Sequence, residues 1–314
     1  MKNKKIITSI LCITFTCASL LIPPIAIGGN GFGHATVTNA EPEILVVTPL
    51  TPAWTLMSSF SPNIPMYCNV TVRDVDNVSD ISNVTLEVVY WGYWGFDDPR
   101  YYYKFYYDNT TDTWSQILPN PLAVIYIDVP SCTKTTLSST VANFSFAFTL
   151  NKTAQDTNGV IRWRTRAQVY DDSGNLDVGS ITEYVMNPFV EVTYWGNAGP
   201  TDFQWTGTPE SNQSIPFNTL VTANDQYWLN ASYNGSFQPP WGEPTIWIAK
   251  SGNPAYQLPD WEVTSTNVTW FYAPAGFVYY LDNQTHTISL VFAPGITAGT
   301  TYTGVTIWIE AHND

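Results

Sequence analysis

Charged side chains are scarce in this chain. Asp, Glu, Lys and Arg make up 12% of its 314 residues, about half of the share that soluble proteins usually carry. Three of the 12 basic groups lie in residues 1–40, which contain no acid, so nine basic groups face 26 acidic ones beyond residue 40, a net charge of −17. Such a surface repels nucleic acid and anionic lipid. We therefore expect no nucleic-acid partner.

The usual catalytic motifs are also missing. Beyond residue 40 the histidines are His286 and His312, and neither stands in a metal-binding spacing. There is no G-x-S-x-G nucleophile motif and no glycine-rich phosphate loop. The adjacent carboxylates of residues 97–98 and 171–172 are poor candidates for a glycosidase pair, because neighbours on one loop do not set the required separation. The sequence favours a protein that is not an enzyme.

Long apolar runs are limited to one, at residues 6–22, which follows three lysines in the first five residues and precedes two prolines. This order is typical of an export signal. Residues 1–40 are predicted to be signal peptide and leader, with cleavage before Glu41; a site nearer Ala26 or Gly28 and an uncleaved anchor are the alternatives. Since no second long run follows, we expect no membrane span in the mature chain and a secreted or cell-envelope location.

Cysteine is rare beyond the leader, where only Cys68 and Cys132 remain. In an exported protein two cysteines favour one intramolecular disulfide, and such a bond stabilises a fold by roughly 2–4 kcal/mol. Two buried thiols, or a bond between chains, are the alternatives.

Helical periodicity is absent beyond residue 40, whereas aromatic residues reach 15% and include 13 tryptophans and 19 tyrosines. Aromatic and β-branched residues favour strands. The clearest strand lies within Ile161–Asp177, where Trp163 and its alternate neighbours share one face, and Arg162, Arg164 and Arg166 share the other. The polar residues 171–175 then predict a turn. The arginine stripe is expected to pair with acids on adjacent strands or with an acidic neighbouring molecule.

Similar patterns predict strands along the whole chain after the leader. They favour an all-β fold of two tandem immunoglobulin-like antiparallel β-sandwiches, residues 41–187 and 188–314, each near the usual sandwich size of ~100 residues. The first strand, 43–50, is expected either to belong to the first sandwich or to be lent to a neighbouring molecule. The other expected strands are 66–75, 83–91, 101–107, 113–117, 122–129, 141–150 and 180–186, then 189–195, one within 220–233, 245–249, 267–272, 287–292 and 301–310.

Three segments, 68–74, 84–90 and 169–175, resemble prokaryotic, including archaeal, immunoglobulin-like and cadherin-like repeats, in which a strand often ends in an aspartate and a Gly-Asn turn. The resemblance covers about residues 43–187. Residues 295–307 resemble the closing hairpin of sandwich domains in secreted surface and filament proteins. These resemblances imply a cell-surface protein with a structural or adhesive role.

The sequence contains eleven N-x-S/T sequons, which predict a glycoprotein. Strand alternation places several of these asparagines, among them Asn230, opposite the core-facing residues, where a glycan is tolerated. A chain rich in Asn, Ser and Thr also forms sequons by chance. The candidates are Asn69, Asn77, Asn83, Asn109, Asn143, Asn151, Asn212, Asn230, Asn234, Asn267 and Asn283.

Two acidic turns make calcium a candidate ligand, because calcium takes six to eight oxygen ligands, many of them carboxylates. Loops at one end of a sandwich can converge to supply them. The alternative, which we favour, is ordinary hydrogen bonding of Asp and Asn side chains within turns. The candidate ligands are Asp74, Asp76 and Asp80 in one turn and Asp171, Asp172 and Asp177 in the other.

Aromatic loops supply the last candidate site, formed by Trp91, Trp94, Tyr101 and Trp241. Exposed aromatic rings stack on sugars or become buried at protein interfaces; alternatively, they fill the space between sheets. The sequence as a whole favours a structural or adhesive protein of the surface layer or of a filament. Other cell-surface proteins or copies of the same chain are its expected partners. The alternative is a carbohydrate-binding protein that uses the aromatic loops.

Overall fold

The computed structural model describes residues 38–122, 124–157, 162–179, 182–196, 207–208, 210–234, 245–250, 255–258, 268–274, 279–292 and 306–313. The chain divides into two compact units, residues 1–38 and 39–314, and every described strand belongs to the second. The predicted export signal lies outside the described residues. Among the residues that are described, no helix is long and apolar enough to cross a membrane.

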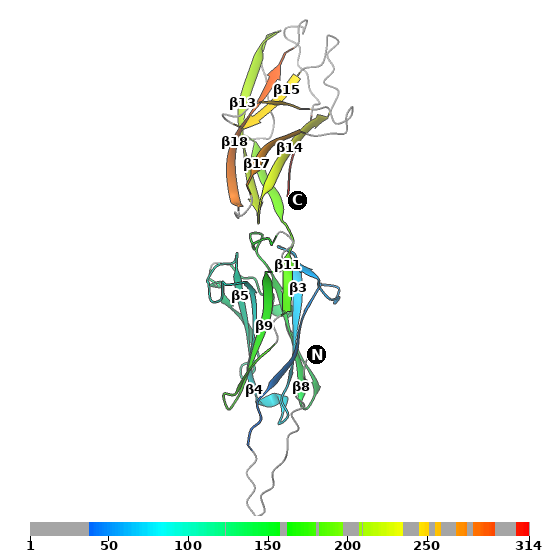
Figure 1. Cartoon of the computed structure of the whole chain (residues 1–314), viewed down its shortest axis with the longest axis vertical. Coiled ribbons are helices and arrows are strands. Elements are labelled where there is room, and N and C mark those ends of the chain that lie inside the picture. Colours follow the sequence, from blue (N-terminus) through cyan, green and yellow to red (C-terminus); the bar gives the residue numbers. More distant parts are fainter. Residues whose placement is uncertain are drawn as a thin grey trace, which may run out of the picture. The chain divides into compact units, whose positions relative to one another are not determined.

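The fold is all-β, as predicted, and its first part is a pair of sheets around one core (Figure 1). We call it the first sheet pair. One sheet has the order β1-β3-β8-β7, and the other has the order β2-β11-β9-β4-β5-β6, with β10 also paired to β9. The strands are β1 (Glu43–Leu50), β2 (Ser59–Phe60), β3 (Pro65–Arg73), β4 (Ile81–Tyr90), β5 (Tyr102–Asp108), β6 (Thr113–Leu118), β7 (Thr133–Ser138), β8 (Val141–Thr149), β9 (Trp163–Asp171), β10 (Leu176–Val178) and β11 (Thr182–Met186).

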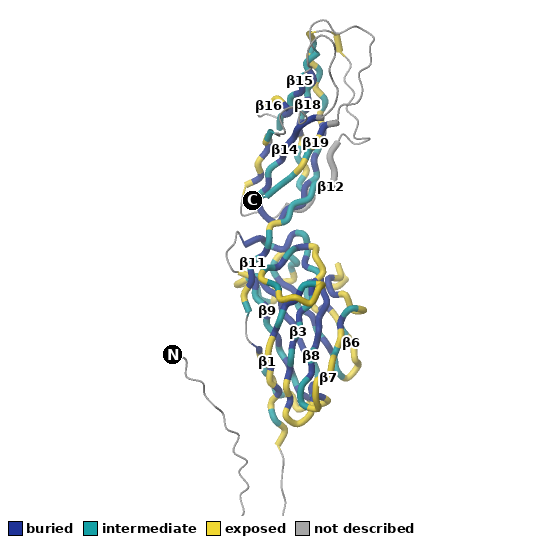
Figure 2. The backbone as a smooth tube through the Cα atoms, turned by 90° about the vertical axis from the view of Figure 1, so that its right-hand side faces the viewer, coloured by how far each residue is buried: buried dark blue, intermediate teal, exposed yellow. Residues whose placement is uncertain are grey.

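Alternation of side chains explains how these strands enclose a core. In β3 and in β9 every second residue is buried, from Met66 to Val72 and from Trp163 to Asp171. The core-facing residues meet those of β4, β5 and β8, and Trp163 is among the largest side chains that are fully buried. Figure 2 shows the buried residues along β3, β8 and β9 and the exposed ones along β6 and β7. The period of two seen in the sequence is therefore the period of the core.

The first strand, β1, pairs antiparallel with β3 of its own chain, from Glu43 opposite Arg73 to Leu50 opposite Tyr67. This is the first of the two predicted alternatives. β9 pairs with β11, which lies within the strand expected at 180–186, and β5 pairs with β6, the strands expected at 101–107 and 113–117.

A second pair of sheets follows, which we call the second sheet pair, and it encloses a separate core that includes Phe217, Leu229, Ile248 and Ile288. Its sheets have the orders β12-β13-β18-β15-β16 and β17-β14-β19. The strands are β12 (Val190–Gly196), β13 (Asn212–Ala223), β14 (Tyr227–Asn234), β15 (Thr245–Lys250), β16 (Tyr256–Gln257), β17 (Val268–Ala273), β18 (Tyr279–Val291) and β19 (Thr306–His312).

The strand expected within residues 220–233 is β14, and Asn224 and Asp225, whose side chains favour turns, separate it from β13. One predicted strand is wrong. The described residues of 122–129 belong to no strand, and only Ile127 makes an isolated bridge, to Phe148. Prolines flank this segment, and its backbone bonds partly to β8, where the Asp128 amide donates to the Ala147 carbonyl at 2.8 Å, and partly to the Gln116 side chain. The amide of Gln116 donates to the Val124 carbonyl at 3.0 Å and accepts from the Tyr126 amide at 2.7 Å.

The predicted disulfide is also wrong, because Cys68 and Cys132 are both free and buried. Cys68 lies opposite Phe146 of β8, whereas the Sγ atom of Cys132 accepts a hydrogen bond from the amide of Ala147, on the same strand, at 3.2 Å. β8 thus separates the two thiols by about two strand spacings, roughly 9.6 Å. A disulfide requires Cα atoms within about 6.8 Å. The alternative of two buried thiols is the one that the structure contains.

Candidate functional site

The outer face of the sheet that contains β5, β4 and β9 carries an unusual number of charged groups. In the register of these strands, Glu87 lies between Arg166 of β9 and Lys104 of β5, and Val89 lies opposite Arg164. All of these side chains point away from the core, since Leu86 and Val88 occupy the inward positions. A sheet face that points outward is ordinarily in contact with water, yet Glu87 and Val89 are buried.

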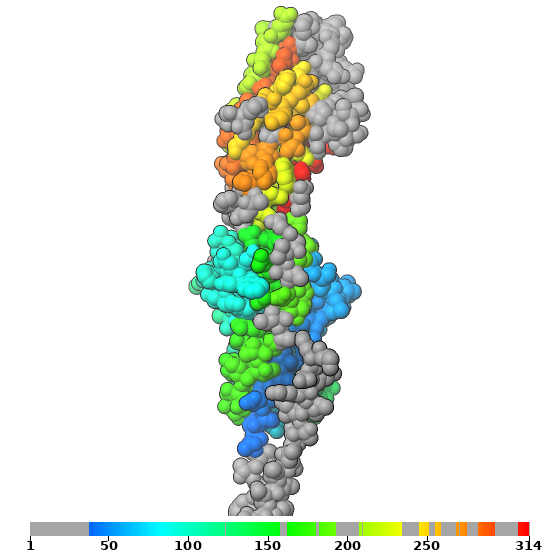
Figure 3. Space-filling view, viewed as in Figure 1, coloured from blue at the N-terminus to red at the C-terminus, as the bar shows by residue number. Residues whose placement is uncertain are grey.

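The aromatic loop after β4 covers this face. Gly92 and Gly95 adopt φ angles of 90° and 79°, a conformation that other residues rarely adopt, and they allow the loop to turn back on the sheet. The Arg164 guanidinium lies 3.8 Å from the ring centre of Trp91, and the Arg166 guanidinium lies 4.0 Å from that of Trp94. Two cation–π pairs therefore hold the loop in place. In Figure 3 the cyan surface near residue 100 lies beside the green surface of β9.

This surface is called the Arg–Trp face below. Its members are Glu87, Trp91, Trp94, Lys104, Arg162, Arg164 and Arg166.

Glu87 is the centre of the Arg–Trp face and is only 3% exposed. Its carboxylate accepts hydrogen bonds from the Tyr102 hydroxyl and from Arg166 Nε, both at 2.6 Å, and Lys104 Nζ lies 3.6 Å away. Burial, followed by the hydrogen bond to Glu87, raises the pKa of Tyr102. This hydroxyl therefore keeps its proton and donates a hydrogen bond to Glu87. A buried carboxylate with three donors is satisfied. Glu87 therefore serves to anchor the face rather than to react.

Arg164 and Arg166 of β9, and Arg162 just before it, differ in their pairing. Arg166 forms an ion pair with Glu87, and Arg164 forms one with Glu183 of β11 at 2.5 Å. Pairing with acids on adjacent strands, one of the two predicted outcomes, is thus confirmed for these two. Arg162 is exposed, and within the described part of the chain no ion pair involves it.

The aromatic residues near this face are only partly covered. Trp91 is 50% exposed and Phe96 is 52% exposed. The Tyr93 and Tyr101 rings are stacked, with centroids 4.2 Å apart, and Phe96 packs edge-on against Tyr93. Of the aromatic residues predicted to bind a ligand, Trp91, Trp94 and Tyr101 therefore belong to one aromatic loop region. Trp241 lies outside the described residues.

The two acidic turns meet at the opposite end of β4 and β9, where the Asp172 amide donates to the Asp80 carbonyl at 2.7 Å. Their carboxylates accept hydrogen bonds within the turns and from β1: Asp171 accepts from the Asn175 amide of its own turn at 2.8 Å, and Asp177 accepts from the Ile44 amide of β1 at 2.7 Å. Asp74 and Asp76 also accept backbone hydrogen bonds. No group of three metal-binding side chains occurs within the described ranges. The geometry is that of Asx turns.

The sequon asparagines differ in accessibility. Asn77, Asn212 and Asn283 are exposed, whereas Asn69, Asn83 and Asn143 are half-buried. The prediction that Asn230 faces solvent is wrong: it is buried on the central strand β14, and its Oδ1 accepts from the Thr269 hydroxyl at 2.6 Å. Half-buried Asn151 uses its amide internally, as an acceptor from the Thr153 amide. Asn267 lies outside the described residues. Asn234 belongs to β14, but its burial is not described.

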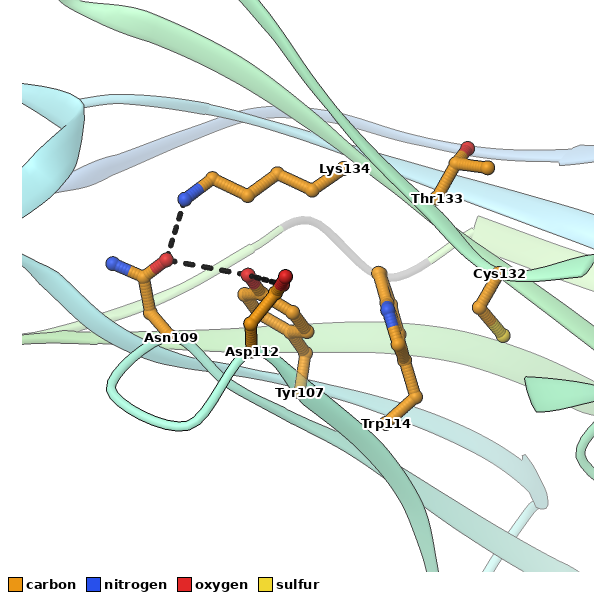
Figure 4. Close-up of a pocket in the computed structure, with 7 residues that line it drawn as sticks. All are labelled: Tyr107, Asn109, Asp112, Trp114, Cys132, Thr133 and Lys134. Atoms are coloured by element: carbon orange, nitrogen blue, oxygen red, sulfur yellow. Dashed lines mark hydrogen bonds between the residues drawn. The ribbon is translucent and has the colours of Figure 1, made fainter. Parts of the chain in front are cut away.

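A cavity of about 450 Å³ opens between the β5–β6 hairpin and the start of β7. Figure 4 shows that Lys134 Nζ donates to Asn109 Oδ1 and that the Tyr107 hydroxyl donates to Asp112 at 2.7 Å. Asn109 Nδ2 also donates to the Ile81 carbonyl at 2.6 Å. The polar groups in this cavity are therefore already used by one another. Its lining residues are Tyr107, Asn109, Asp112, Trp114, Cys132, Thr133 and Lys134.

Comparisons with known proteins give the chain no family. No family model matches it, and no curated protein matches its sequence. Among solved structures, a DUF4785 family protein from Legionella pneumophila is 9% identical, with a TM-score of 0.24, and the match covers 85% of this chain and 47% of that one. The chain thus spans about half the length of that protein.

Two further structures are similar at the same level. A DUF4466 family protein from Parabacteroides merdae is 9% identical over 81% of this chain and 100% of that one, with a TM-score of 0.26. The alpha-2-macroglobulin of E. coli is 11% identical over 84% of this chain and 16% of that one, with a TM-score of 0.25. Likenesses at these TM-scores carry no functional argument.

Proposed function

We propose that this chain is a non-enzymatic, secreted or cell-envelope glycoprotein with a structural or adhesive role, and that the Arg–Trp face is its contact surface. In this proposal the two sheet pairs are tandem immunoglobulin-like sandwiches that follow a cleaved leader. The partners are other cell-surface proteins or copies of the same chain. The exposed, pre-positioned Trp91 is the observation that carries the proposal.

Trp91 supports the proposal because it is a half-exposed indole in a loop that also exposes Phe96, and such apolar area can be buried by a partner. Arg164 covers one face of the ring and fixes its position, so that little conformational entropy is lost when a partner binds. A catalytic role for this face is disfavoured, since the oxygen atoms of Glu87 are taken by Tyr102, Arg166 and Lys104.

Retention of the purified secreted protein on cell-envelope material from the producing cells, together with electron microscopy over a range of salt concentrations, tests this role. We expect retention or ordered assembly, and loss of either in Trp91→Leu. The matched control is Trp54→Leu, because Trp54 is 54% exposed but stacks on Tyr67. A protein that stays monomeric and unretained at every salt concentration would refute the proposal.

A carbohydrate-binding role is the second candidate. It is favoured by one specific observation, the half-exposed Trp91 on the same sheet face as the exposed Arg162.

A further inference from the structure

Arg164 covers one face of the Trp91 ring, and the residue remains half exposed. Arg164 lies 3.8 Å from the ring centre, and the residue keeps 50% of its exposure. An indole that is packed on a single side presents a flat apolar surface to solvent. A sugar ring offers a matching surface, because the C–H groups on one side of the ring are apolar while its hydroxyls point outward.

The Arg–Trp face carries more basic groups than acidic ones. Lys104, Arg164 and Arg166 are matched by Glu87 and Glu183, whereas Arg162 forms no ion pair within the described residues. Four of the nine basic groups beyond residue 40 are thus concentrated here. The rest of the chain is strongly acidic, so that a ligand with a modest negative charge is attracted here and repelled elsewhere.

Arg162 and Trp91 are close in space. The Trp91 amide donates to the Arg162 carbonyl at 2.8 Å. Because Tyr90 pairs with Trp163, Trp91 and Arg162 are the next pair along the two strands, and their side chains leave the sheet on the same face. A guanidinium beside an aromatic face recognises a ligand that has both a carboxylate and an apolar ring, since the planar guanidinium bonds a carboxylate through two N–H groups.

We propose that the Arg–Trp face binds an acidic glycan, with a carboxylate-bearing sugar ring stacked on Trp91 and its carboxylate bound by Arg162. This inference rests on the proposed role of the Arg–Trp face as a contact surface and names its ligand. A polyphosphate such as nucleic acid is a poorer fit, because the surrounding acidic chain repels its dense charge. The other occupant to be tested is a second copy of this chain.

Calorimetry with pentagalacturonate and its methyl-esterified form tests the proposal, because the ester keeps the sugar rings and removes their charge. The wild-type protein is expected to bind the acid at least about tenfold more tightly than the ester at low salt. Arg162→Gln is expected to bind acid and ester equally. Trp91→Leu is expected to bind both about tenfold more weakly than the wild type does.

Two variants serve as controls. Arg73→Gln removes an exposed charge that pairs with Glu43, and Trp54→Leu removes an equally exposed indole away from the face. Both are expected to bind like the wild type. Circular dichroism and thermal melting verify that Arg162→Gln and Trp91→Leu fold.

Four results would overturn the inference: no binding of the acid by the wild type, equal binding of acid and ester, equal losses in Trp54→Leu and Trp91→Leu, or unchanged binding by a folded Arg162→Gln/Trp91→Leu double variant. Sedimentation velocity separates this inference from the proposed function. If the double variant loses self-association while the wild type ignores the glycan, a second copy of the chain occupies the face. The contact role would then stand and the glycan would not.

Discussion

Glu87 in the first sheet pair and His286 in the second are both buried ionisable side chains, but their surroundings differ. In the first sheet pair Glu87 lies on an outer sheet face, where Arg166, Lys104 and Tyr102 surround its carboxylate and the aromatic loop covers it. In the second, His286 lies inside the core, beside Phe217 and Phe271, and shares a hydrogen bond of 2.9 Å with the Thr219 hydroxyl.

The difference lies in the partners that each side chain has. Burial, and then the charge of Lys250, lowers the pKa of His286 to about 4, so the core holds a neutral imidazole at pH 7. Glu87 instead has the Tyr102 hydroxyl and two basic side chains around it. A polar group can therefore be buried either among apolar rings or within a cluster of hydrogen-bonding and charged partners.

Removal of the Glu87 carboxylate should have the largest effect on the stability of the protein. Glu87→Ala leaves Arg166 and Lys104 without their counter-charge and Tyr102 without its acceptor, so we expect a loss of about 3 kcal/mol in the free energy of unfolding. Urea denaturation followed by tryptophan fluorescence measures it. The control is Glu183→Ala, whose carboxylate pairs with Arg164 but is 42% exposed, with an expected loss below about 1 kcal/mol. Equal losses would show that burial of Glu87 does not matter.

Acid should weaken the second sheet pair through His286. Because the pKa in the folded protein lies below the unfolded value of 6.5, the unfolded chain binds the proton more tightly. The contribution is complete above pH 6.5 and falls as the pH drops towards 4, by about 2 kcal/mol between pH 7 and pH 5. Urea denaturation of the wild type and of His286→Gln over this range measures the difference.

His312→Gln is the matched control for that measurement, since His312 stacks on Trp228 at the end of β19. We expect its pH profile to follow that of the wild type, whereas the profile of His286→Gln flattens. If the two histidine variants behave alike, the core placement of His286 is not the cause.

The smallest effect is expected from a reductant. A disulfide between Cys68 and Cys132 would be its target, and both residues belong to the first sheet pair. Both thiols are free and buried, and burial raises the pKa of Cys132 to about 11, which suppresses its reactive thiolate. Dithiothreitol should leave the unfolding midpoint unchanged. Alkylation of the denatured, unreduced protein, followed by peptide mass analysis, should label both cysteines; an unlabelled pair would reveal a disulfide.

Alternation predicts edge strands as well as central ones: β1, at the edge of its sheet, is found at the predicted residues 43–50. β3 and β9 are central strands, and each is predicted within two residues at either end. The segment 122–129 was predicted as a strand from its apolar residues, yet Leu122 is 92% exposed. The contact that decides its structure is the bonding of its backbone by Gln116, which a local pattern does not contain.

The candidate site was predictable only in part. The arginine stripe and the aromatic loop are visible in the sequence, and the structure brings them together through Trp91 and Trp94. Glu87 escaped notice because alternation in β4 directs it outward, where a carboxylate is usually solvated. The missing information was the return of the loop over the sheet. The two glycines at positions 92 and 95 were its only local signal.

The prediction of a disulfide was wrong for a related reason. The compartment and the cysteine count favour a bond, but strand order decides the distance, and the place of β8 between β3 and β7 is set by pairing over the whole sheet. The convergence of the two acidic turns was predicted correctly, although local hydrogen bonds use their carboxylates.

The pairing of β1 with β3 has a mechanical consequence. β1 begins at the end of the sheet pair where the acidic turns meet, whereas β11 leaves from the other end, since Tyr184 pairs with Trp163 and the turns follow Asp171. Tension between these two ends acts along β1, at right angles to its antiparallel hydrogen bonds with β3. The bonds are then loaded together in shear instead of being peeled one by one. The first sheet pair is therefore arranged to resist stretching.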